Sequence, residues 1–236
     1  MRFLVTAGST REMIDRVRAW GNIFTGNTGY SIARALAAVG DVDLLTSNRE
    51  HLAEIERAPA SGFRILGSSF ASHEQLKHSL QSALKTQKYD AIFMSAAIAD
   101  YRPAGSFQVV RRETLDNGEE RWIVRNVQAD KVKSSYEQIA ILGERTQKLV
   151  DLLRTEWGYS GFLVKFKLEV GITPQQLIQI GQASRKASGA NYLVANTLDM
   201  VEGERAGAYL LGENGEEWVP RGTLAGRLAK LVQDEL

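Results

Sequence analysis

The residues best suited to chemistry follow a short apolar run near the middle of the chain. Tyr89-Asp-Ala-Ile-Phe93 is typical of a buried strand, and it leads into Met94-Ser-Ala-Ala-Ile-Ala-Asp-Tyr-Arg-Pro103. Small residues at the carboxyl end of a parallel strand let a ligand approach the backbone closely. The carboxylate of Asp100 can then bind a ribose, a base or a metal-bound phosphate. An N-cap role or pairing with Arg102 would also explain this carboxylate. The segment nevertheless favours a ligand site with Asp100 as its acidic member.

A second candidate segment is the long connection from Gly8 to Thr28, which follows the short apolar run Phe3-Leu-Val5. Loops of this length inside a compact domain are usually functional. Asn22 and Gly26 lie near the end of the loop, just before an expected helix N-terminus, and helix N-termini bind anions through free N–H groups. Taken alone, a turn-capping role explains Asn22 better, and turn geometry explains each glycine as well as ligand contact does.

The glycines do not have the G-x-G-x-x-G spacing of a dinucleotide site. The end of the second expected strand reads Thr46-Ser-Asn-Arg49, without the acid that binds a ribose. An ordinary NAD site is therefore disfavoured, although Arg49 leaves an NADP variant open. Lys165 and Lys167 alternate with apolar neighbours, so both face the same side of a strand, toward either solvent or a cleft.

The three histidines, at positions 51, 73 and 78, have no metal-ligand spacing with acids, and all three are expected at the surface. There is also no nucleophile elbow of the kind that a serine hydrolase needs. Neither a histidine-based metal site nor serine hydrolysis is predicted.

The elements that position these residues alternate along the chain. Strands are predicted at 3–5, 42–45, 63–66, 90–94, 162–168 and 192–195, and helices at 29–39, 72–86, 144–156, 174–188 and from 223. This alternation predicts an α/β fold with a doubly wound, mostly parallel sheet. We expect one domain over residues 1–236, with an inserted β-hairpin at about 105–128 that turns at Asn117-Gly118. A second hairpin is predicted around Asn214-Gly215.

The composition is that of an ordinary globular chain: 236 residues, 44% hydrophobic, 24% charged, with a net charge of +1. The near-neutral charge gives no reason to expect nucleic acid or an anionic membrane as a partner. There is no cysteine, which excludes disulfides, thiolate metal sites and a cysteine nucleophile. No apolar run at the start is long enough for a signal or a membrane span, so a cytoplasmic location is expected.

The inserted hairpin carries apolar residues with no domain of their own to pack on: Phe107, Val109, Trp122 and Val124. An isolated two-stranded hairpin is marginally stable in water. A second copy of the chain would bury this surface, so the sequence predicts a homodimer.

Together these segments resemble the phosphopantothenate–cysteine ligase family, most closely its single-activity bacterial form. The resemblance rests on Val5–Asp15 through Arg18, Asn22–Gly29, Ala96–Arg102, Lys131-Val-Lys-Ser-Ser135, Phe166–Gly171 and Val194-Ala-Asn196. It implies a Rossmann-like fold with a dimerisation appendage. It also implies a ligase of coenzyme A biosynthesis that joins 4′-phosphopantothenate to cysteine through an acyl-nucleotidyl intermediate, driven by CTP or ATP.

The resemblance assigns roles to particular residues. The catalytic residues would be Asn22 and Lys131. The nucleotide would contact Gly8, Ala96, Ala97, Asp100, Lys131 and Phe166, and the other substrates would contact Thr10, Arg18, Asn22, Gly26 and Asn196. Mg²⁺ is expected with the triphosphate, since charge develops at phosphorus, but no metal ligands are assigned.

The chain departs from the family beside the catalytic amide, where Ile23 and Phe24 replace small polar residues. An insertion also separates Asp100 from Lys131. Two alternatives therefore stay open: an NADP-linked oxidoreductase, and a non-catalytic nucleotide-binding regulator on the same scaffold.

Overall fold

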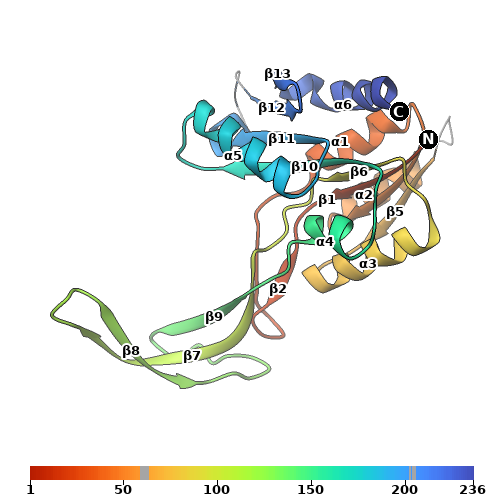
Figure 1. Ribbon diagram of the computed structural model, residues 1–236. Helices are drawn as coiled ribbons and strands as arrows, with labels where there is room; N and C mark the ends of the chain where they lie inside the picture. The colour runs from red at the N-terminus through yellow and green to blue at the C-terminus, as the bar shows by residue number, and fades with distance from the viewer. Residues whose placement is uncertain (59–63, 202, 204–205) are drawn as a thin grey trace.

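The computed structural model describes residues 1–58, 64–201, 203 and 206–236. At its centre lies an eight-stranded sheet in the order β13-β12-β11-β10-β6-β1-β4-β5 (Figure 1). The parallel strands are β1 (Arg2–Ala7), β4 (Asp41–Thr46), β5 (Ile65–Ser69), β6 (Ala91–Met94), β10 (Phe162–Glu169) and β11 (Tyr192–Thr197). The chain winds outward from β1 toward β5 and then from β6 toward β11. This doubly wound order confirms the predicted α/β, Rossmann-like fold.

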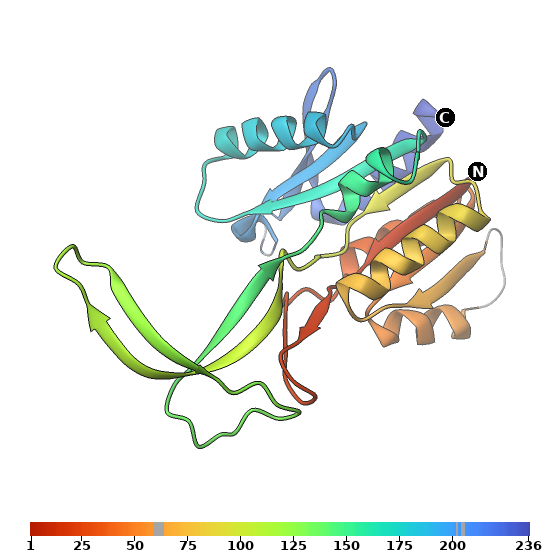
Figure 2. The same cartoon turned by 60° about the horizontal axis from the view of Figure 1, so that its bottom comes forward.

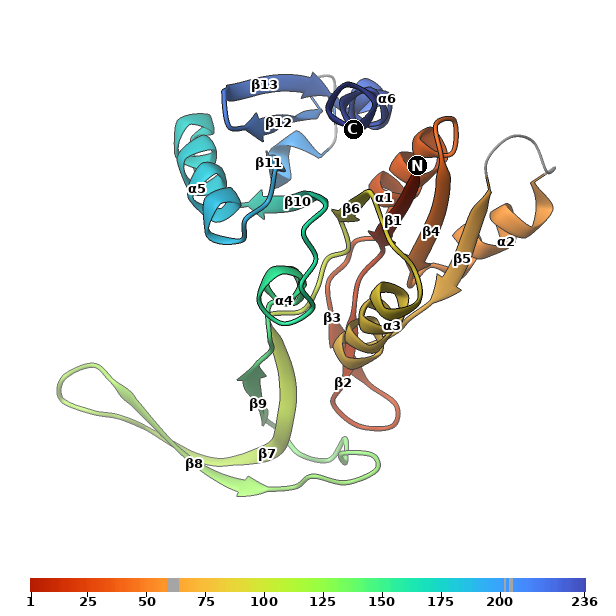
Figure 3. The same ribbon diagram turned by 45° about the vertical axis from the view of Figure 1, so that its right-hand side comes forward.

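Helices cover both faces of the sheet (Figure 3). One face carries α1 (Asn27–Leu36), α2 (Arg49–Arg57) and α6 (Arg221–Glu235), and the other carries α3 (His73–Thr86), α4 (Leu149–Thr155) and α5 (Pro174–Ala187). Side chains of the strands alternate between the two layers: Phe3 and Val5 pack with α1, whereas Leu4 packs with α3. None of the helices in the described ranges is long and apolar enough to cross a membrane.

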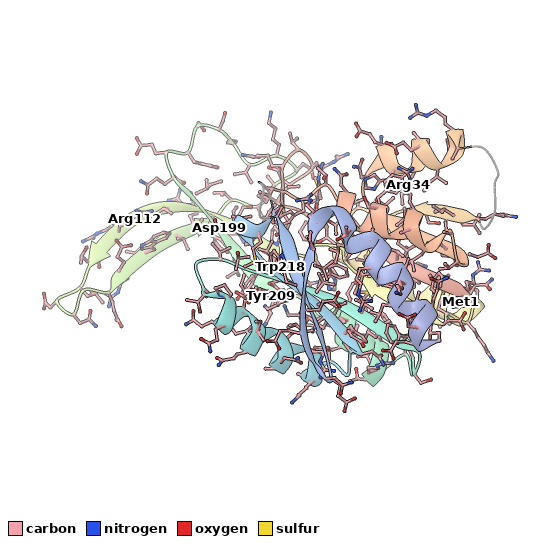
Figure 4. The ribbon with its side chains drawn as sticks, turned by 90° about the horizontal axis from the view of Figure 1, so that it is seen from above. Met1, Arg34, Arg112, Asp199, Tyr209 and Trp218 are labelled. Atoms are coloured by element: carbon pink, nitrogen blue, oxygen red, sulfur yellow. The ribbon has the colours of Figure 1, made fainter. Side chains whose placement is uncertain are left out.

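An antiparallel hairpin closes one edge of the sheet, formed by β12 (Gly207–Gly212) and β13 (Gly215–Pro220). Tyr209 and Trp218 lie edge to face across it, with ring centroids 4.9 Å apart (Figure 4). This hairpin was predicted from the Asn214-Gly215 turn.

The adjacent helix α5 also begins as predicted, because Pro174 occupies its first turn and Thr173 forms a capping box with Gln176.

A three-stranded arm projects from the body between β6 and α4 (Figure 2). It consists of β7 (Tyr101–Thr114), β8 (Glu120–Asn126) and β9 (Ile139–Arg145) in the order β8-β7-β9. The predicted turn is present: Gly118 has φ 81°, and the Glu119 N–H donates to Asn117 Oδ1 at 3.0 Å. Arg112 lies on the arm, well away from the central sheet (Figure 4).

One face of this arm carries a row of apolar side chains. The pairing register places Val109 opposite Val124 and Phe107 opposite Ala140, so side chains two residues away share that face. We call these residues the arm face: Phe107, Val109, Trp122, Val124 and Leu142. Trp122 and Val124 are each 43% exposed, and Leu142 is 51% exposed. The four residues predicted from the sequence thus share a face with Leu142, and the Arg112 guanidinium lies over the Trp122 ring, 4.1 Å from its centroid.

Four details of the fold differ from the sequence predictions. The helix predicted at 144–156 begins only at Leu149, because Arg145 still pairs with Tyr101 in the arm. Helix α2 was not predicted, and the long first loop contains an unpredicted ribbon of β2 (Arg11–Met13) and β3 (Ala19–Gly21). The strand predicted at 63–66 is β5, and its predicted first residue, Phe63, lies outside the described residues.

The prediction that all three histidines lie at the surface is wrong for two of them. His51 is 3% exposed: its ring stacks on Tyr30 with centroids 4.4 Å apart, and Nδ1 lies 3.0 Å from Thr46 Oγ1. Burial lowers the pKa of His51. His73 is also buried, and its Nε2 lies 2.8 Å from the Gln147 carbonyl oxygen. Hydrogen-bond partners on neighbouring elements make both burials possible.

Candidate active site

A cleft lies at the carboxyl ends of the central strands, where the winding direction of the sheet reverses between β1 and β6. Open α/β sheets bind ligands at this switch point. The cleft has two adjoining cavities of about 450 Å³ and about 230 Å³. Both are lined by Phe24, Ala96, Ala97, Phe166, Lys167 and Leu168. We call them the larger and the smaller cavity.

Glycines allow α1 to begin close to the end of β1. Gly26 has φ 84°, and a Cβ built on it would lie 2.0 Å from the Gly8 nitrogen. A Cβ on Gly29 would lie 2.3 Å from Ser95 Oγ. All three glycines line the smaller cavity. Backbone packing therefore requires Gly26 and Gly29, and it brings the N-terminus of α1 to the cavity wall.

Asn22 lines the larger cavity, and its Nδ2 donates to the Ala97 carbonyl oxygen at 3.1 Å. The same carbonyl accepts the Thr10 N–H at 3.1 Å, and the Ala97 N–H donates to the Gly8 carbonyl at 2.8 Å. These bonds join the long first loop to the segment after β6. Asn22 is therefore held beside Ala96 and Ala97, which are distant from it in sequence.

Asp100 also lines the larger cavity, and its carboxylate is paired with the ammonium of Lys148. Nothing in the local sequence indicates Lys148 as a site residue, because only the fold brings it to Asp100. Phe166 lines both cavities, and Asn196 lines the smaller one. Gly8 lines the smaller cavity, away from Asp100.

Three of the residues that the resemblance assigns to the site line neither cavity in the described part of the chain. Thr10 is fully buried, and its Oγ1 accepts the Ala99 N–H at 2.9 Å, so it supports the cavity wall from behind. Arg18 pairs with Asp15 at 2.5 Å and donates to the Val132 carbonyl at 2.6 Å. Lys131 is exposed on the loop before β9. The NADP candidate, Arg49, begins α2 and also lines neither cavity.

Lys165 and Lys167 do face a cleft rather than bulk solvent, since both line the larger cavity. Their alternation with apolar residues in β10 could not distinguish a cleft from solvent. Lys165 Nζ donates to Ser184 Oγ at 3.0 Å and to the Ser184 carbonyl at 3.2 Å. Lys167 pairs with Glu169 at 2.8 Å. The β10 alternation was thus the sequence signal for these two cavity residues.

Comparison with known proteins shows what parts of this chain are similar to. Residues 1–114 match the family described as DNA/pantothenate metabolism flavoprotein C-terminal domain. The coenzyme A biosynthesis bifunctional protein CoaBC of Thermococcus kodakarensis is 29% identical over all 236 residues of this chain, which cover 50% of that protein. CoaBC of Mycobacterium tuberculosis strain H37Rv is 40% identical over 104 residues, covering 44% of this chain and 23% of that protein.

The chain is homologous to the C-terminal domain of CoaBC. It spans about half the length of the Thermococcus CoaBC. The DNA/pantothenate metabolism flavoprotein from Streptococcus pneumoniae has a solved structure with a TM-score of 0.80 and 26% identity, and all of both chains is covered. A Cab2 mutant in complex with phosphopantothenate-cysteine shares the fold, with a TM-score of 0.68 and 16% identity over 99% of this chain and 85% of that chain.

Proposed function

We propose that this protein is a phosphopantothenate–cysteine ligase of coenzyme A biosynthesis. The observation that carries the proposal is the Asn22 amide, held against Ala97 in the switch-point cleft of a chain homologous to CoaBC. A carboxylate does not condense with an amine in water without activation. Attack of the 4′-phosphopantothenate carboxylate on the α-phosphorus of a triphosphate forms an acyl-nucleotidyl anhydride and releases pyrophosphate. The amine of cysteine then attacks the acyl carbon, and the nucleoside monophosphate leaves.

We assign the nucleotide to the larger cavity, with Ala96, Ala97, Asp100 and Phe166, and 4′-phosphopantothenate to the smaller one. The smaller cavity contains the α1 N-terminus, Gly26 and Asn196. Helix N-termini favour anions, which suits the phosphate of this substrate. The two reacting groups would meet along the shared wall, where Phe24 contributes to both cavities.

Asn22 is proposed to stabilise the second step. Its NH₂ group has two N–H donors, and one of them is bonded to the Ala97 carbonyl. The other can donate to the acyl oxygen as it gains negative charge during attack by the amine. An amide side chain held in this way acts as an oxyanion-hole donor. Although Ile23 and Phe24 stand beside it where the family has small polar residues, Asn22 still lines the larger cavity.

Mg²⁺ fits the proposed nucleotide site. No group of three or more His, Asp or Glu residues is arranged to hold a metal in the described ranges. Nucleotide-bound Mg²⁺ needs only one or two carboxylates, because phosphate and water oxygens supply the other ligands. Asp100 and Asp151 both line the larger cavity and can serve this purpose. The ion would neutralise charge at phosphorus, and we propose either CTP or ATP as its partner.

We also propose that the enzyme is a homodimer that associates through the arm face. Its five side chains belong to strands that project from the body (Figure 2), and three of them, Trp122, Val124 and Leu142, are more than 40% exposed. Burying such a surface against a second copy removes apolar area from water. A cytoplasmic location is proposed as well, as expected of a biosynthetic enzyme that consumes CTP or ATP.

The proposal is tested by pyrophosphate release with CTP or ATP, with and without 4′-phosphopantothenate, followed by cysteine addition and mass analysis of the product. Pyrophosphate should appear only when 4′-phosphopantothenate is present, and the amide only after cysteine is added. A chain that binds the triphosphate and releases no pyrophosphate would instead be a regulator. Tight NADPH binding without any effect of CTP or ATP on the melting temperature would favour the oxidoreductase.

A further inference from the structure

Lys165 is held in an unusual position for a lysine. It lies in β10, where its partner in the register of β6 is Met94, the last residue before the Ser95–Asp100 segment. Its side chain is partly buried on the α4 and α5 side of the sheet and lines the larger cavity. Its Nζ donates to the hydroxyl and carbonyl oxygens of Ser184 in α5. The ammonium is therefore fixed at the cavity wall.

Within the described part of the chain, Lys165 has no carboxylate in ion-pairing distance, unlike the two other lysines of the cavity. Lys148 pairs with Asp100, and Lys167 pairs with Glu169. Burial lowers the pKa of Lys165, Asp151 opposes this shift, and the nearby Lys167 and Lys148 add to it. Taking a charge out of water without a counter-ion is unfavourable. An anionic ligand beside Lys165 would offset that cost.

The charged residues that line the larger cavity are Lys148, Lys165, Lys167, Asp100 and Asp151. Cations therefore outnumber carboxylates on its wall. A lysine ammonium is a compact point charge that suits phosphate oxygens. Several ammonium groups along one cavity match an extended polyphosphate better than a single phosphate group.

We propose that Lys165 binds the polyphosphate chain of the nucleotide, with Lys148 and Lys167 beside it. This inference rests on the proposed function, since it names the residues that bind the co-substrate in that site. Ser184 positions the ammonium, and the triphosphate supplies the counter-charge that the described side chains do not. Lys165 contacts the phosphates in this arrangement even though Lys131 is the lysine indicated by the family resemblance.

The test measures the binding of CTP, ATP, inorganic tripolyphosphate and 4′-phosphopantothenate by calorimetry to the full chain, to Lys165→Gln and to Lys165→Arg. Lys186→Gln is the matched control, because Lys186 is an exposed residue of α5 outside both cavities. Removing a charge-assisted hydrogen bond should raise the Kd of tripolyphosphate and of the triphosphate about tenfold or more. The Kd of 4′-phosphopantothenate should not change, and Lys165→Arg should restore most of the affinity.

If Lys165→Gln binds the triphosphate with a Kd within twofold of that of the unmodified chain, the inference is overturned and the ligase proposal stays intact. A selective loss of 4′-phosphopantothenate affinity would also overturn it, because Lys165 would then serve the other substrate. If the unmodified chain binds no triphosphate, both the inference and the proposed function fail. If thermal unfolding shows that Lys165→Gln is misfolded, Lys165→Met, which also removes the charge and keeps the apolar stem, is measured in its place against the same criteria.

Discussion

At the scale of single residues, the proposed reaction gives the two donors of the Asn22 amide separate roles. One is bonded to the Ala97 carbonyl, and the other is available to the acyl oxygen. Asn22→Asp keeps the size of the side chain but replaces a donor with an acceptor beside that oxygen. Losing one oxyanion donor typically slows a reaction by roughly a hundred- to a thousandfold. We expect pyrophosphate release to continue and amide formation with cysteine to slow by that factor.

The measurement for Asn22→Asp is a quenched-flow assay that follows pyrophosphate and amide separately. Asn117→Asp, in the turn of the arm, makes the same chemical change far from the cleft and should behave like the unmodified enzyme. Amide formation at the unmodified rate in Asn22→Asp would show that Asn22 only caps the loop.

A second residue-scale prediction concerns Lys131, which lies outside both cavities of its own chain. The family resemblance assigns it to the triphosphate, where a cation is most effective as charge develops at phosphorus. Lys131→Gln should therefore slow pyrophosphate release and leave the melting temperature unchanged. Lys133→Gln is the matched control on the same loop. Equal pyrophosphate kinetics in both variants would make Lys131 an ordinary surface charge.

At the scale of elements, Asp15 connects the long first loop to the loop that carries Lys131. Its carboxylate accepts the Val132 N–H at 3.1 Å and the Val17 and Arg18 N–H groups at 2.8 Å each. Burial alone would raise the pKa of Asp15, but these N–H groups and the Arg18 guanidinium hold it well below its usual range. The segment Asp15–Arg18 thus orients the Lys131 loop.

This arrangement predicts how stability depends on pH. Because the pKa of Asp15 is lower in the folded chain than in the unfolded chain, its ionised form stabilises the fold above the unfolded pKa, and this contribution is lost as pH falls. Asp15→Asn places an NH₂ group against N–H donors and should lower the melting temperature near neutral pH. The difference from the unmodified chain should shrink below about pH 4. A difference that is constant from pH 7 to pH 3 would contradict this account.

Elements with a strong apolar pattern could be predicted from the sequence, and weakly patterned ones could not. The strands near residues 3, 42, 90, 162 and 192 are apolar runs between turn signals, so they were located within a few residues. Helix α2 reads Arg49-Glu-His-Leu-Ala-Glu-Ile-Glu-Arg57 and was missed because it has few apolar side chains, although Asn48 caps its N-terminus. For the same reason His51 was misplaced, since its partners Tyr30 and Thr46 come from other elements.

The residues of the candidate site also differ in how well they could be predicted from the sequence. Asp100 could be selected from its local segment, whereas Asn22 and Phe166 were selected through the family resemblance. All three line the larger cavity. Lys148 carries no local signal, because its pairing with Asp100 depends on how α4 follows the arm. Spacing along a strand shows that Lys165 and Lys167 share a face, but only the packed α5 shows what that face meets.

At the scale of the whole molecule, the arm face predicts how copies associate. Val124→Asp places a charge in the middle of this apolar face and should convert dimers to monomers, because burying an unpaired carboxylate is strongly unfavourable. Ile123→Asp is the matched control: it is 44% exposed but points to the opposite side of β8. Sedimentation velocity at micromolar concentration distinguishes the two. A monomeric unmodified chain, or a dimer that persists in Val124→Asp, would refute association through this face.

The arm leaves the body and returns to it at almost the same place, because Tyr101 pairs with Arg145 at its base and β6 and β10 are neighbours in the sheet. Beyond that base, added residues extend a loop that is already closed, and the entropy of closing a loop rises only slowly with its length. Insertions and deletions at the β7–β8 turn should disturb the cleft little, because the loop that contacts Asp15 and Arg18 lies between β8 and β9. Evolution can therefore lengthen or shorten this hairpin, and so change the proposed dimer, without rebuilding the body.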